Sequence, residues 1–140
     1  MIHPCNNATI EKAVSVINDG EIIIYPTDTL YGFGVDATNS RAIEKLNKLK
    51  NRKDPLSIIV SSLSQIKEYG KLNEESEEII NKIFPGPFTI LIESIDSNLS
   101  PLVNSSSKYI GIRIPEHPFP TKLVETLGRP IITTSVNKKN

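Results

Sequence analysis

The sequence contains a single cysteine, Cys5, so it cannot form an internal disulfide. His3 is the nearest other metal-binding side chain, and two ligands near a terminus, without partners at metal spacing, do not predict a metal site. No apolar run approaches the length that crosses a bilayer, and the first residues, MIHPCNN, lack the basic and then apolar segments of a secretory signal. We therefore expect a cytoplasmic protein with no membrane segment and no metal bound by its own side chains.

Net charge is also absent, because 16 basic side chains balance 16 acidic ones. This balance argues against non-specific nucleic-acid binding by the whole surface. The charge is unevenly placed, since residues 41–53 hold six basic residues and one acid, Glu44. A bound phosphate group would offset the repulsion within this cluster, and a basic helix end exposed to solvent explains it equally well.

The length of 140 residues fits one domain, residues 1–140, with a single core. Apolar residues at helical spacing alternate with short apolar runs typical of buried strands. The expected helices begin at the caps Asn7, Ser40 and Asn73 or lie over 61–70 and 121–127, and the expected strands are 21–25, 55–60, 88–93, 109–114 and 130–135. This alternation predicts an α/β fold with a mixed, twisted, open sheet, because some connections are too short for crossovers.

The segment YIGIRIP, which begins at residue 109, has a readable geometry. Strand alternation places its three isoleucines on one face and Arg113, with Gly111 and Tyr109, on the other. The missing side chain at Gly111 leaves room for a ligand to approach the guanidinium, whose planar fork suits a carboxylate or phosphate. An arginine that reaches solvent or pairs with a glutamate is the alternative.

The segment YPTDTLYGFG, residues 25–34, is interpreted as a loop that follows a buried strand and carries polar side chains and two glycines. Gly32, Gly34 and Ala37 fit the pattern G-x-G-x-x-A of dinucleotide-binding proteins. The context does not fit, because PTDTLY separates the strand from the glycines and the next helix begins only near Ser40. The sequence also has no phosphate-binding P-loop and no Ser-His-Asp set.

Five segments occur in an order that is specific in combination: YPTDTLYGFG, LKNR with PLSIIV, FPGPFTILI, IGIRIPEHP and GRPIITTSVN. Over residues 19–137, the chain resembles the YrdC-like family, the threonylcarbamoyl-AMP synthases. The resemblance implies a twisted open sheet with flanking helices and a concave, basic groove.

It also implies a nucleotidyltransferase reaction. ATP, L-threonine and bicarbonate or carbon dioxide would give threonylcarbamoyl-AMP and pyrophosphate, with Mg²⁺ accompanying ATP. Partner proteins would then transfer the threonylcarbamoyl group to an adenosine of tRNA. Contact of the protein itself with tRNA or double-stranded RNA is a further expectation.

The family motif P-T-[DE]-T-x-Y-G assigns Thr27, Thr29 and Tyr31 to the threonine pocket. By the same resemblance, Arg113 binds the threonine carboxylate and Thr133 belongs to the same pocket.

The motif K-x-R falls on Lys50 and Arg52, which would bind the triphosphate and stabilise charge as pyrophosphate leaves. The motif S-x-N falls on Ser135 and Asn137, which would contact the nucleotide.

Four departures from the family pattern qualify this reading. Only Lys53 stands near the place of a second lysine, Tyr109 replaces a small hydroxyl residue, and Val136 crowds the S-x-N motif. The chain is also expected to be short at its C-terminus, at Asn140, so that threonine binding is weak and synthesis slow. Two alternatives stay open: a non-catalytic RNA-binding YrdC-like module, and carbamoyl-adenylate chemistry related to hydrogenase maturation.

Overall fold

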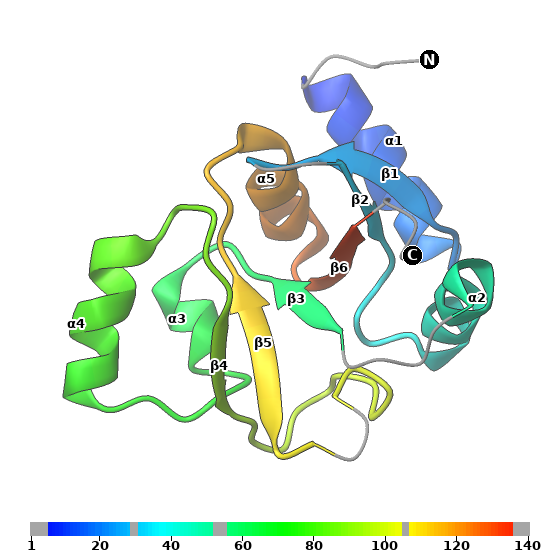
Figure 1. Ribbon diagram of the computed structural model, residues 1–140. Helices are drawn as coiled ribbons and strands as arrows, with labels where there is room; N and C mark the ends of the chain where they lie inside the picture. The colour runs from blue at the N-terminus through cyan, green and yellow to red at the C-terminus, as the bar shows by residue number, and fades with distance from the viewer. Residues whose placement is uncertain (1–5, 29–30, 52–55, 105–106, 136–140) are drawn as a thin grey trace.

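A computed structural model describes residues 6–28, 31–51, 56–104 and 107–135 (Figure 1). The helices are α1 (Asn7–Asn18), α2 (Ser40–Lys50), α3 (Leu63–Ile66), α4 (Glu74–Ile83) and α5 (Pro118–Leu127). The strands are β1 (Ile23–Pro26), β2 (Tyr31–Gly34), β3 (Ser57–Ile59), β4 (Ile90–Glu93), β5 (Tyr109–Arg113) and β6 (Ile131–Ser135).

The helices begin at side-chain caps that satisfy free backbone N–H groups. Asn73 caps α4 as predicted, with its Oδ1 accepting a hydrogen bond from the N–H of Ser76 at 2.8 Å. The caps of α1 and α2 are Asn6 and Asn39, so the predicted caps, Asn7 and Ser40, are each wrong by one residue. Helix α5 starts earlier than predicted because its first position is a proline, which suits the first helical turn.

The six described strands form one sheet in the order β1-β2-β6-β3-β5-β4. Strands β3 and β5 are parallel, and every other neighbouring pair is antiparallel. The predicted α/β fold with an open, mixed sheet and flanking helices is therefore confirmed.

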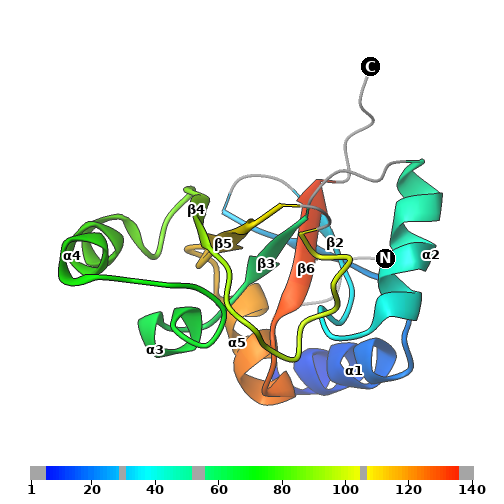
Figure 2. The ribbon, with the colours of Figure 1, turned by 90° about the horizontal axis from the view of Figure 1, so that it is seen from below.

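Helices cover both faces of this sheet. Figure 2 shows α1 and α5 side by side beneath the sheet, where they pack against one core. The strand residues of this core include Tyr25, Ile59 and Ile131.

Helices α2, α3 and α4 contribute to a second core on the opposite face. Its strand residues include Ile58, Ile110, Ile112 and Ile132. The predicted inward face of residues 110, 112 and 114 is confirmed, since all three isoleucines are buried.

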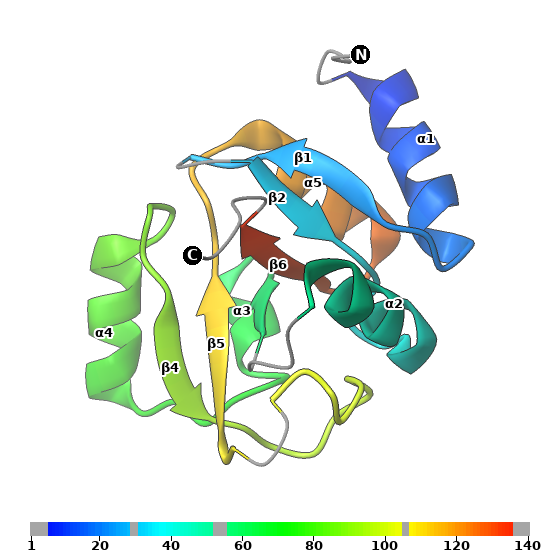
Figure 3. The ribbon, with the colours of Figure 1, turned by 45° about the vertical axis from the view of Figure 1, so that its right-hand side comes forward.

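The segment predicted as a loop over residues 25–34 is largely a β-hairpin. Strand β2 pairs with β1 on one side and β6 on the other, with Gly32 opposite both Tyr25 and Ser135 (Figure 3). Its two glycines lie beside the buried ring of Tyr25, and a Cβ on Gly34 would stand only 2.7 Å from Cε1 of that ring. The missing side chains thus make room for a core tyrosine, which periodicity could not reveal because the tyrosine belongs to the neighbouring strand.

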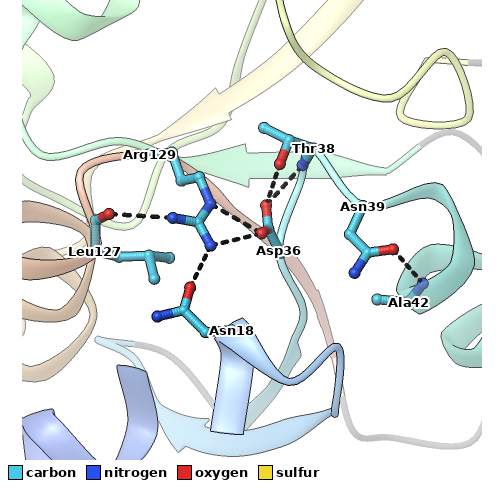
Figure 4. A network of polar contacts seen from close by, with 7 residues as sticks. All are labelled: Asn18, Asp36, Thr38, Asn39, Ala42, Leu127 and Arg129. Atoms are coloured by element: carbon cyan, nitrogen blue, oxygen red, sulfur yellow. Dashed lines mark hydrogen bonds and ion pairs between the residues drawn. The ribbon is translucent and has the colours of Figure 1, made fainter. Parts of the chain in front are cut away.

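An ion pair between the buried Asp36 and the partly exposed Arg129 lies at the centre of a polar network that joins three segments (Figure 4). Arg129 Nε donates to Asp36 Oδ2 at 2.8 Å, and Arg129 Nη2 donates to Asn18 Oδ1 at the end of α1. The other oxygen of Asp36 accepts hydrogen bonds from the backbone N–H and the hydroxyl of Thr38, at 2.9 and 2.7 Å. Both carboxylate oxygens are therefore satisfied, and the network links α1, the loop after β2 and the turn before β6.

Candidate functional site

Arg113 ends strand β5 and forms an ion pair with Asp28, which follows β1. Its Nη2 donates to Asp28 Oδ1 at 2.7 Å, and the two side chains are only 11% and 10% exposed. The Nε of Arg113 is buried and has no hydrogen-bond partner among the described residues. A buried donor without an acceptor calls for an oxygen from water or from a ligand. Arg113 thus keeps binding capacity despite its pairing.

Small and hydroxyl-bearing residues form the sheet surface next to this pair. Register places Ser57 between Gly111 on β5 and Thr133 on β6, so the three share one face. The same face opens to solvent toward the edge strand β4, where Leu91 is 72% exposed. The surface therefore offers two hydroxyls and a strand-end guanidinium on one side of the sheet.

Gly111 does not leave empty space as the sequence interpretation supposed. A Cβ built on Gly111 would stand 2.6 Å from Ser57 Oγ and 3.4 Å from Thr89 Cγ2. The side chains of neighbouring strands take up the room that the glycine leaves.

We expect Gly111→Ala to lower the free energy of unfolding by about 1–2 kcal/mol, because the added methyl group overpacks against Ser57 Oγ. Ser57→Ala removes that oxygen, and the nearest remaining Ser57 atom, Cβ, lies at an ordinary 3.4 Å. Urea denaturation of both single variants and the double variant measures the effect. Recovery of less than half of the loss in the double variant would assign the cost to another contact.

Tyr25 lies on the same face of the sheet as Thr133, because it pairs with Gly32, which pairs with Ser135. Its ring is fully buried and stacks near Phe119 of α5, with ring centroids 6.4 Å apart. Its hydroxyl lies beside that of Thr133 but has no partner of hydrogen-bond geometry among the described residues. Burial raises the pKa of the phenol, and the nearby Thr133 hydroxyl and Arg113 charge lower it only in part.

This shift predicts a loss of stability at high pH. The folded protein keeps the Tyr25 proton, whereas the unfolded chain releases it above pH ~10, so the unfolded state then binds fewer protons. The free energy of unfolding should fall as pH rises, by up to about 1.4 kcal/mol per pH unit from this group. Tyr25→Phe should remove that part of the slope, which urea denaturation at pH 9, 10 and 11 measures. Equal slopes for the two proteins would contradict the assignment.

Lys50 lies on the opposite face of β6 from Thr133. Its Nζ donates to Oγ1 of Thr134 at 3.2 Å and stands 5.7 Å from the centroid of the Phe33 ring. Neighbouring strand residues point to opposite faces, so Thr134 and Thr133 face away from each other. Lys50 and Arg113 therefore lie on opposite faces of the sheet.

The remaining predicted site residues lie as follows. Thr27 is half-buried after β1, and Tyr31 is half-exposed on the face of β2 that also carries Phe33. Ser135 ends β6, where its backbone pairs with Gly32. Thr29, Arg52 and Asn137 lie outside the described residues.

Asp28 and Ser57 are site residues that the sequence reasoning missed. Asp28 lies within the same PTDT segment as the predicted threonine ligands, and an acid beside them was a signal for a basic partner. Ser57 carried no local signal, because only the pairing of β3 with β5 and β6 places it there.

Among the described residues, no group of three or more His, Cys, Asp or Glu side chains is placed to hold a metal ion. None of the described helices is long and apolar enough to span a membrane.

Comparison with known proteins shows the family to which this chain belongs. Residues 15–140 match the family model Sua5_yciO_yrdC, whose description is telomere recombination. The chain belongs to the Sua5/YciO/YrdC family. Its resemblance to the YrdC-like proteins, inferred from five sequence segments, is thereby confirmed.

Individual relatives and a solved structure of the Sua5/YciO/YrdC family are also similar to this chain. The chain is 30% identical to a threonylcarbamoyl-AMP synthase of Bacillus subtilis over 94% of its own length. It is 33% identical to one of Photobacterium profundum over 91% of its length. The crystal structure of P. abyssi Sua5 complexed with L-threonine superimposes with a TM-score of 0.89, at 28% identity over 96% of this chain.

The chain covers different shares of these family members. It spans 39% of the B. subtilis protein, 71% of the P. profundum protein and 40% of the P. abyssi Sua5 chain.

Proposed function

We propose that this chain makes threonylcarbamoyl-AMP from ATP, L-threonine and bicarbonate or carbon dioxide, with release of pyrophosphate. The observation that carries the proposal is the match to the P. profundum synthase, most of whose length the chain covers. The L-threonine complex of P. abyssi Sua5 supports threonine as the amino acid. We also propose that the product serves proteins that modify tRNA.

The proposed chemistry needs no covalent enzyme intermediate. The deprotonated threonine amine adds to the carbon of carbon dioxide and forms a carbamate. A carbamate oxygen then attacks the α-phosphorus of ATP, the bond from that phosphorus to the β-phosphate oxygen breaks, and pyrophosphate leaves. This transfer makes the chain a nucleotidyltransferase. Mg²⁺ enters as part of the substrate MgATP, and holding the reactants in line supplies up to about 7–11 kcal/mol in ideal cases.

The threonine carboxylate is assigned to Arg113, whose buried Nε N–H has no acceptor among the described residues. The hydroxyl of Thr133 lies on the same face of the sheet as the arginine. Thr27, Thr29 and Tyr31 are proposed to complete the threonine pocket, although Tyr31 begins β2 on the opposite face of the sheet, with Phe33.

The phosphates are assigned to Lys50 and Arg52, and the rest of the nucleotide to Ser135 and Asn137. Because Lys50 donates to Thr134, the phosphates would lie on the face of β6 opposite to the face that carries Thr133.

The proposal is tested by pyrophosphate release that requires both threonine and bicarbonate, with the nucleotide product identified by mass spectrometry. Turnover that stops when either substrate is omitted is the expected result. Binding of double-stranded RNA without threonine-dependent use of ATP would favour the RNA-binding alternative and reject the synthase.

Lys50→Ala is expected to weaken ATP binding about ten- to a hundredfold while changing threonine binding less than twofold, because a charged hydrogen bond contributes ~1.5–3 kcal/mol. Lys48→Ala is the matched control, since Lys48 is an exposed lysine in the same last turn of α2. Calorimetry with each ligand separately distinguishes the two. Equal losses of ATP binding in both variants would indicate a diffuse effect of charge on α2.

A further inference from the structure

Asp28 is bound at both carboxylate oxygens. Oδ1 accepts a hydrogen bond from Arg113 Nη2 at 2.7 Å, and Oδ2 accepts one from the backbone N–H of Glu116 at 2.9 Å. Asp28 follows β1, whereas Arg113 and Glu116 stand at the end of β5 and in the segment that leads to α5. The side chain thus joins two connections that are 85 or more residues apart in sequence.

We propose that Asp28 is a positioning residue that aims the Arg113 guanidinium at the threonine carboxylate; this inference rests on the proposed function. An arginine side chain has several rotatable bonds, and a strand fixes only its Cα. Asp28 fixes the far end of the side chain at Nη2. The strand thus fixes one end of the Arg113 side chain and Asp28 fixes the other. The buried Nε donor stays available for a ligand oxygen.

The second bond of Asp28 fixes the carboxylate itself. Because the Glu116 amide belongs to the main chain, it anchors Oδ2 without the freedom of a side chain. The backbone at Glu116 therefore orients the Asp28 carboxylate, and the carboxylate orients the Arg113 guanidinium. Groups held in this way lose less conformational entropy when a substrate binds.

Asp28→Asn separates orientation from simple filling of space. The amide has the same size as the carboxylate but only one acceptor oxygen, so it satisfies either Arg113 or the Glu116 amide and turns an N–H₂ group toward the other donor. The charge that offsets the guanidinium is also lost. The expected consequence is a guanidinium that samples several orientations.

The chain contains a matched control in the pair Asp36–Arg129. In this pair the Asp36 side chain is 7% and the Arg129 side chain 29% exposed, the N–O distance is 2.8 Å, and the pair joins the loop after β2 to the turn before β6. Asp36→Asn removes the same charge from the same kind of pair away from Arg113. A loss of threonine binding that follows from reduced stability alone would appear in both variants.

The experiment measures threonine- and bicarbonate-dependent pyrophosphate release by the full chain, with melting temperatures taken in parallel. Asp28→Asn should raise the threonine KM about tenfold or more, as expected for a misaligned charged contact, with the ATP KM within about twofold of the wild type. Asp36→Asn should lower the melting temperature and leave the threonine KM within about twofold. Asp28→Glu, which restores the carboxylate, should recover part of the threonine KM.

Each remaining outcome decides between the two proposals. A wild-type protein that turns over while Asp28→Asn keeps the wild-type threonine KM, or matches Asp36→Asn, overturns the role of Asp28 and leaves the synthase standing. A wild-type protein with no threonine-dependent turnover rejects the synthase, and the role of Asp28 with it. If Asp28→Asn does not fold, Asp28→Glu and Asp28→Ser are compared instead. A threonine KM that Asp28→Ser raises more than Asp28→Glu does confirms the role of the carboxylate. Equal threonine KM values in these two variants overturn it.

Discussion

Arg113→Ala should abolish measurable threonine binding and lower the free energy of unfolding by about 3–5 kcal/mol. The truncation removes the carboxylate ligand that we propose, and it leaves the Asp28 charge buried without its partner, which is the costly way to break a buried pair. Calorimetry with threonine and urea denaturation measure the two effects.

The double variant Arg113→Ala with Asp28→Ala provides the control. Removing both charges leaves no uncompensated charge, so the double variant should be no less stable than Arg113→Ala alone. Threonine binding should stay absent in the double variant, because the guanidinium is still missing. Strictly additive losses of stability would show that the two side chains do not interact as the 2.7 Å distance indicates.

Gly34→Ala should lower the free energy of unfolding by about 1–3 kcal/mol, whereas Gly32→Ala should change it by less than about 1 kcal/mol. A Cβ on Gly34 would stand 2.7 Å from Cε1 of the Tyr25 ring, which is enclosed and cannot retreat. A Cβ on Gly32 would meet that ring and the Thr133 hydroxyl at 3.4 and 3.5 Å, which are ordinary contacts.

Urea denaturation of the two variants tests the contrast, with the same residue type, strand and substitution in both. Similar losses would show that both glycines are needed for the conformation of β2 rather than for the space around Tyr25. Because Gly32 faces the candidate site, its variant is also the one expected to affect ligand binding.

Local patterns in the sequence were sufficient for the order of the elements and for the inward face of β5. An apolar run or a helical period is a property of neighbouring residues, so Ile110 and Ile112 could be assigned to a core before any partner was known. The family resemblance likewise rested on short segments, each of which keeps its residues together in the chain.

Only the tertiary structure could decide which of these segments meet. Tyr31–Gly34 is a strand because it pairs with β1 and β6. Its local sequence, in which two of four residues are glycine, indicated a loop instead. Arg113 binds Asp28 from 85 residues away, and Lys50 binds Thr134 from 84 residues away. The sequence by itself thus determined the α/β class and the family. The partner of each charged side chain, and the face of the sheet on which that side chain lies, depend on pairing between distant strands, which the periodicity of neighbouring residues does not contain.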